Sequence, residues 1–170
     1  TYKRNTTAMR LYDYTYWSSP VSDFSLYSLS PNTVPNEYYS YNPTLGWSSI
    51  NNGAANMTAG VGYILSAPQS YSNSYATVYN ANFIGVPNNG DVNVTPTATK
   101  WNLVGNPYPS SLDAREFIIA NTVPGSETIE GSLYFWTHNT LPDNIDPGQN
   151  NRYFYTSDDY AAYNLTGSLV

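Results

Sequence analysis

Residues 101–113, WNLVGNPYPSSLD, constrain the fold more than any other stretch of the chain. The first five alternate as a strand does, and the first proline ends that strand because its nitrogen has no hydrogen to donate to a ladder. The second proline repeats the block, and Ser110 or Ser111 is then positioned to cap a short helix, expected near residues 111–121. The residues of this structural motif are Trp101, Asn106, Pro107, Pro109 and Asp113.

The composition favours short strands around this corner. Aromatic residues make up 16% of the chain, tyrosine occurs 18 times, and charged residues are only 11%. This excess of tyrosine over charge disfavours a helical bundle and suits half-buried strands. We therefore expect an all-β fold, a two-sheet antiparallel β-sandwich of the jelly-roll or immunoglobulin-like kind, as a single domain over residues 1–170.

Alternating large side chains predict roughly nine or ten short strands. Residues 37–41 and 44–50 are expected to form a hairpin, and Asn89-Gly90 is a strong signal for a second one. The glycines of GVGYILSA indicate close backbone packing or a bulge in a central strand rather than nucleotide binding. The predicted strands lie at residues 9–17, 37–41, 44–50, 60–67, 76–86, 91–96, 101–105, 129–136, 152–156 and 160–165.

The charge of the chain excludes several classes of protein. The net charge is −6, and six scattered Lys and Arg residues provide no basic track for the phosphates of a nucleic acid. The absence of cysteine excludes disulfides and thiolate metal sites. No apolar run is long enough to predict a membrane span. A surface rich in Tyr, Asn and Thr but poor in charge leads us to expect an extracellular protein.

Seven segments in this order carry a family resemblance. They are YTYWSSP (14–20), YYSYNP (38–43), GVGYILSAP (60–68), FIGVPNNG (83–90), the 101–113 motif, LYFWTHNT (133–140) and DDYAAYNLTG (158–167). Together they resemble a domain of large surface proteins that gliding Gram-negative bacteria export through the type IX secretion system. The resemblance implies a fragment of a long, adhesin-like or fibre-like protein at the cell surface, and it brings no catalytic residues.

No constellation of residues predicts an enzyme. The lone histidine, His138, has no GxSxG-type nucleophile to serve, and a hydrolase of that kind needs a base between an acid and a nucleophile. We expect His138 to form hydrogen bonds at the end of a strand. The carboxylate pairs lie at a helix start or in turns, so a hydrolase is the least favoured function.

One acidic loop is a candidate calcium site. Hard cations take several oxygen ligands from flexible turns, so structural calcium is the one cofactor that the sequence suggests. The alternative is a solvated loop whose Asx side chains bond to their own backbone. The candidate ligands are Asp143, Asn144, Asp146, Asn150, Asp158 and Asp159.

Aromatic side chains are the candidate contact residues, namely Trp47, Tyr38 and Tyr39. Tyrosine is favoured at protein–protein contacts, and exposed tryptophan and tyrosine also stack on sugar rings. The four tryptophans lie in strand patterns, which favours core packing instead. We expect a non-enzymatic structural or adhesive module that contacts neighbouring domains or subunits of its surface protein or fibre; the alternative is a carbohydrate-binding module with glycan partners.

Overall fold

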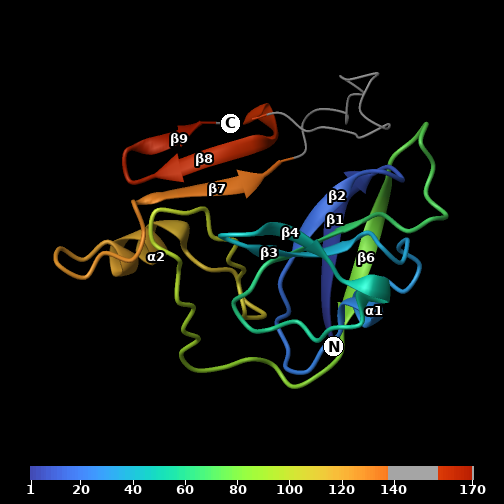
Figure 1. Cartoon of the computed structure of the whole chain (residues 1–170), viewed down its shortest axis with the longest axis horizontal. Coiled ribbons are helices and arrows are strands. Elements are labelled where there is room, and N and C mark those ends of the chain that lie inside the picture. Colours follow the sequence, from blue (N-terminus) through green and yellow to red (C-terminus); the bar gives the residue numbers. More distant parts are fainter. Residues whose placement is uncertain (138–156, 170) are drawn as a thin grey trace. The chain divides into compact units, whose positions relative to one another are not determined.

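The computed structural model describes residues 1–137 and 157–169. It divides into two compact units, Thr1–Leu112 and Asp113–Val170, and each is described by itself (Figure 1). Every ladder in the described part of the chain is antiparallel, which confirms the all-β, sandwich-like fold. The expectation of a single domain over residues 1–170 stays a prediction.

The first unit contains two antiparallel sheets. One is the ribbon β1–β6, and the other has the strand order β2-β5-β3-β4. Its elements are β1 (Tyr2–Met9), β2 (Tyr14–Trp17), α1 (Leu26–Leu29), β3 (Tyr38–Asn42), β4 (Gly46–Ser49), the 3-10 helix η1 (Asn51–Gly53), β5 (Tyr63–Ser66) and β6 (Thr77–Phe83).

The core of the first unit joins both sheets. Inward residues of β2, β3 and β5 meet Ala81 and Phe83 of β6, and the turn of helix α1 adds Leu26 and Leu29. All four residues of β5 are buried, as a strand between two neighbours requires. This confirms the prediction that residues 60–67 contain a central strand. The core residues are Trp17, Val21, Phe24, Leu26, Leu29, Tyr38, Met57, Tyr63, Leu65, Ala81 and Phe83.

The predicted strand over residues 9–17 is wrong, because a turn divides it. The amide of Arg10 donates to Oδ2 of Asp13 (2.6 Å), and the amide of Asp13 donates to the carbonyl of Arg10 (3.0 Å). Asp13 is buried and uses its carboxylate in place of a ladder partner. β1 therefore ends at Met9, and β2 begins at Tyr14 in the other sheet.

The first predicted hairpin is confirmed and the second is wrong. β3 pairs with β4 from Tyr39↔Ser49 to Asn42↔Gly46. β6, however, pairs with β1 (Tyr2↔Phe83), and residues 91–96 form no strand. Beyond β6 the amide of Asn88 donates to the carbonyl of Pro20 (3.0 Å), so the chain docks against that loop instead of turning back.

The corner at 101–113 forms, but the strand before it does not. Residues 101–105 make one isolated bridge, Val61↔Val104, and Trp101 is 66% exposed. In the corner, Oδ1 of Asn106 accepts from the amide of Tyr108 (2.9 Å), and its Nδ2 donates to the carbonyl of Ser110 (2.6 Å). The side chain of Asn106 therefore stabilises a turn at the Asn-Pro step, and residues 101–105 form no strand ahead of it.

The glycines before β5 pack closely, as predicted. A Cβ on Gly62 would lie 2.5 Å from Cγ of Leu103, and one on Gly60 would lie 2.6 Å from Cγ2 of Val94. The amides of Gly62 and Gly105 donate to the carbonyls of Leu103 (3.3 Å) and Gly60 (3.0 Å). The backbone at Gly60 and Gly62 thus approaches the backbone at Leu103 and Gly105 closely, which a side chain at either glycine before β5 would prevent.

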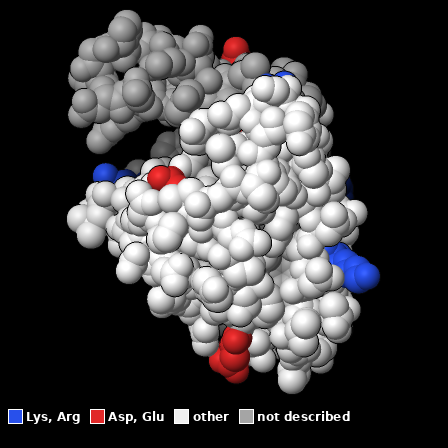
Figure 2. Space-filling model, turned by 90° about the vertical axis from the view of Figure 1, so that its right-hand side faces the viewer, with Lys and Arg blue, Asp and Glu red and all other residues white. Residues whose placement is uncertain are grey.

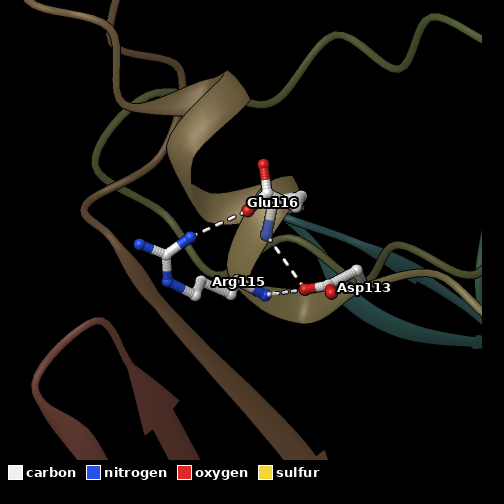
Figure 3. A network of polar contacts seen from close by, with 3 residues as sticks. All are labelled: Asp113, Arg115 and Glu116. Atoms are coloured by element: carbon white, nitrogen blue, oxygen red, sulfur yellow. Dashed lines mark hydrogen bonds and ion pairs between the residues drawn. The ribbon is translucent and has the colours of Figure 1, made fainter.

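The second unit pairs a helix with a three-stranded sheet of order β7-β8-β9. The predicted helix is confirmed, but the predicted serine caps are wrong. Oδ1 of Asp113 caps the helix and accepts from the amides of Arg115 (2.9 Å) and Glu116 (3.1 Å), beside an Arg115–Glu116 ion pair (Figure 3). The Asn106 bond holds Ser110 in the corner, so the helix starts later. The elements are α2 (Ala114–Asn121), β7 (Ser132–Trp136), the 3-10 helix η2 (Ser157–Asp159), β8 (Tyr160–Asn164) and β9 (Gly167–Leu169).

β7 and β8 confirm two of the predicted strands, and their register runs from Ser132↔Asn164 to Trp136↔Tyr160. The predicted strand at 152–156 lies outside the described residues. None of the helices in the described ranges has the length and apolarity to cross a membrane.

Candidate binding face

The outer face of the four-stranded sheet carries a set of aromatic side chains. Successive residues of a strand point to opposite faces, and Trp17, Tyr38 and Leu65 belong to the core. The residues that alternate with these core residues in β2 and β3 therefore point to the outer face of the sheet. The residue of β4 that pairs with Tyr41 points to the same outer face. We call this set the aromatic face: Tyr14, Tyr16, Tyr39, Tyr41 and Trp47.

The aromatic rings of this face come from three of the four strands and form two groups of neighbouring rings. Trp47 lies edge-on to Tyr41, with ring centroids 5.0 Å apart at an interplanar angle of 62°. The same indole is nearly parallel to the ring of Tyr16, at 6.1 Å and 15°. Tyr14 and Tyr39 form a tilted pair at 6.2 Å. Trp47 is 44% exposed and the four tyrosines of the face are half-buried, so the face presents apolar surface to solvent chiefly through the indole.

One carboxylate ties two tyrosines of the face together. Oε2 of Glu37 accepts from the hydroxyls of Tyr14 and Tyr39, the latter at 3.0 Å. Burial, and then the negative charge of Glu37, raise the pKa of Tyr39 above its usual value. Both effects favour the neutral phenol, which keeps its proton to donate to the carboxylate.

The raised pKa of Tyr39 predicts a loss of stability in alkali. A phenol whose pKa is higher in the folded than in the unfolded chain stabilises the fold fully below the unfolded pKa of about 10. That contribution is lost as the pH rises through the folded pKa. We expect the free energy of unfolding, measured by urea titrations from about pH 8 to 11, to fall above about pH 10, and to fall less steeply in Tyr39→Phe.

The matched control for this titration is Tyr75→Phe, at a tyrosine that is 67% exposed, and it should keep the wild-type slope. Equal slopes for Tyr39→Phe and the wild type would contradict the assignment.

A cleft of about 330 Å³ adjoins the aromatic face. Tyr16 belongs to both, because it stacks near Trp47 and also lines the cleft. The cleft lies within the first unit, and its walls come from β1, β2 and the 101–113 corner. Its polar lining residues include Arg4, Asn5, Ser18, Asn106 and Tyr108.

The predicted contact residues separate into two groups. Trp47 and Tyr39 lie on the aromatic face, whereas Tyr38 is 0% exposed and its hydroxyl donates to the carbonyl of Ser30 (2.6 Å). Tyr38 is therefore a core residue, and its prediction as a contact residue is wrong. The expectation that every tryptophan packs in the core is also wrong, because Trp47 and Trp101 are exposed.

The calcium prediction falls mostly outside the described residues, where Asp143, Asn144, Asp146 and Asn150 lie, as does His138. Of the other two ligands, Asp158 is exposed and Asp159 is buried in η2. The backbone carbonyl of Asp159 accepts from the amide (2.8 Å) and hydroxyl (2.9 Å) of Thr137. The described ranges contain no group of three or more metal-binding side chains. Structural calcium stays a prediction.

Sequence reasoning missed Tyr14, Tyr16 and Tyr41 as members of a site. Their signal is the period-two spacing of tyrosines in YDYTY and YYSYN, which indicates one tyrosine-lined strand face. The cleft residues Asn5 and Asn106 carried no such signal, because segments about a hundred positions apart meet there.

Comparison with known proteins gives one match. No curated protein and no solved structure matches this chain. A family model described as "Domain of unknown function (DUF8693)" matches residues 1–170. The chain therefore belongs to the family DUF8693.

Proposed function

We propose that the chain is a non-enzymatic adhesive or structural module of an extracellular surface protein or fibre, exported through type IX secretion by a Gram-negative bacterium. Its contact surface is the aromatic face. The observation that carries this proposal is the set of five aromatic rings gathered on one side of one sheet, with Trp47 exposed. The location rests on the resemblance of the sequence segments.

The chemistry of the surface supports a contact role. Aromatic residues are enriched at the centre of protein interfaces, where they bury a large area at little cost in side-chain entropy. Charged residues make up only 11% of the chain, and few of them lie on the side of the molecule that Figure 2 shows, so contacts of this chain have few ion pairs to draw on. Outer-face tyrosines held by their neighbours are preorganised, and rigid residues lose less freedom on binding.

A carbohydrate-binding module is the second candidate, and one observation favours it. The rings of Tyr16 and Trp47 are nearly parallel (15°), and Tyr16 borders a cleft with amide side chains. Ligand sites of this kind combine apolar surface with a few polar groups that fix the orientation of the ligand.

Adhesion of chain-coated beads tests the contact surface without assuming a ligand. The beads are washed over cellulose, chitin, collagen and a surface coated with the same chain. We expect retention on at least one surface, and Trp47→Ala should weaken it by at least about tenfold, because truncation of an aromatic anchor removes most of the energy of such a contact.

The matched control is Trp101→Ala, which removes an equally large and more exposed side chain outside the aromatic face and should keep the wild-type retention. Equal retention of the Trp47→Ala beads, or no retention on any surface, would count against the proposal.

A further inference from the structure

We infer that the aromatic face and the adjoining cleft form one continuous track for a neutral, linear polysaccharide chain. This rests on the proposed adhesive function and names the class of its ligand. Tyr16 connects the two parts, because its ring is nearly parallel to Trp47 and its side chain lines the cleft.

The Tyr16–Trp47 pair provides the apolar half of the track. A pyranose ring has an apolar face of C–H groups that stacks on an aromatic ring, and the exposed indole of Trp47, which stacks with the ring of Tyr16 (6.1 Å, 15°), offers such a plane. Tyr41 contacts the indole edge-on at 5.0 Å, which restricts the rotation of Trp47. A preorganised platform of this kind suits an extended chain.

The cleft provides the polar half of the track. The side-chain amide of Asn5 can both donate and accept, as recognition of sugar hydroxyls requires, whereas the amide of Asn106 is engaged with Tyr108 and Ser110 and shapes the wall of the cleft. The hydroxyl of Ser18 lines the cleft as a buried group without a hydrogen-bond partner among the described residues. Buried polar groups are normally paired, so this oxygen marks a position where a ligand hydroxyl would complete the pairing.

The charges along the track indicate a neutral ligand. Among the described residues that line the cleft, Arg4 alone is charged, and its guanidinium donates to the carbonyls of Lys3 (3.1 Å) and Pro109. On the aromatic face, Glu37 accepts from Tyr14 and Tyr39. An anionic polysaccharide requires several unengaged cations, and this track does not offer them.

Isothermal titration calorimetry with neutral oligosaccharides of two lengths tests the track. The probes are cellohexaose, xylohexaose, mannohexaose and chitohexaose, with their trisaccharides. We expect the wild type to bind at least one hexasaccharide more tightly than its trisaccharide. Trp47→Ala should weaken both by at least about tenfold. Asn5→Ala should weaken the hexasaccharide about two- to tenfold and leave the trisaccharide unchanged, because only the longer chain reaches the cleft.

Trp101→Ala is the control and should bind as the wild type does. Equal losses of both lengths in Asn5→Ala, or no loss, would overturn the continuous track. Wild-type protein that binds none of the probes, while its beads still adhere to collagen or to the same chain in a Trp47-dependent way, would overturn the polysaccharide inference and leave the adhesive function standing.

Discussion

Phe83→Ala is expected to destabilise the first unit by about 3–5 kcal/mol, the range for truncation of a buried phenylalanine. The side chain is 0% exposed at the end of β6. Its ring centroid lies 5.0 Å from that of Phe24 and 6.1 Å from that of Trp17, so it joins the β6 ribbon to the β2 sheet. Removing the ring leaves a cavity between two sheets that no single strand can close.

Urea denaturation followed by tryptophan fluorescence measures this loss, since Trp17 belongs to the same core cluster. The control is Ile84→Ala at the next position, which is 69% exposed and should change stability by no more than about 0.5 kcal/mol. A loss in Phe83→Ala no larger than that of the control would mean that β6 does not close the core.

Local signals predicted the elements that local interactions determine. The β3–β4 hairpin follows from two alternating segments joined by an Asn-Pro turn, and β5 follows from an apolar run bounded by Pro68. The α2 helix follows from its apolar spacing after the 101–113 corner, whereas its cap, Asp113 instead of a serine, was not predicted. In each case the residues that specify the element lie within about ten positions of one another.

Pairing between distant segments was not predictable in the same way. β6 carries a strong turn signal on its C-terminal side, yet its partner is β1, whose paired residues lie 68 (Met9↔Thr77) to 81 (Tyr2↔Phe83) positions earlier. The partner of β6 is determined by the packing of Phe83 and Ala81 against the four-stranded sheet. This packing is a tertiary interaction, so the local sequence does not reveal it. The Asp13 turn was missed for the opposite reason, because one side chain outweighs an otherwise regular alternation.

Only part of the candidate site was predicted, because successive residues of a strand point to opposite faces of the sheet. Tyr38 and Tyr39 are adjacent and chemically alike, but they lie on opposite faces, and only Tyr39 belongs to the aromatic face. The composition shows that some tyrosines must be exposed. Which tyrosines these are depends on the register of β3 with β5, in which Leu65 and Ile64 are the partners of Tyr38 and Tyr39. The adjoining cleft depends on how β1 and the corner meet, which no local pattern contains.

Gly53→Ala is expected to destabilise the first unit by about 2–4 kcal/mol, through two separate costs. Gly53 has a φ of +60°, which an alanine adopts at a cost of about 1 kcal/mol. An added Cβ would also lie 2.7 Å from the backbone nitrogen of Tyr27 and 2.9 Å from Cε1 of Tyr38. Neither neighbour yields readily, because one is backbone and the other is a fully buried ring, so overpacking adds about 1–3 kcal/mol.

Gly90→Ala separates these two costs. Gly90 also has a positive φ, +76°, but a Cβ there would meet nothing within 4 Å. We expect Gly90→Ala to lose only the conformational part, about 1 kcal/mol, in the same urea titration. The difference between the two variants then measures the close approach of η1 to the Tyr38 ring. Equal losses would show that φ alone requires glycine at position 53, and that the 3-10 turn can move away from the core without cost.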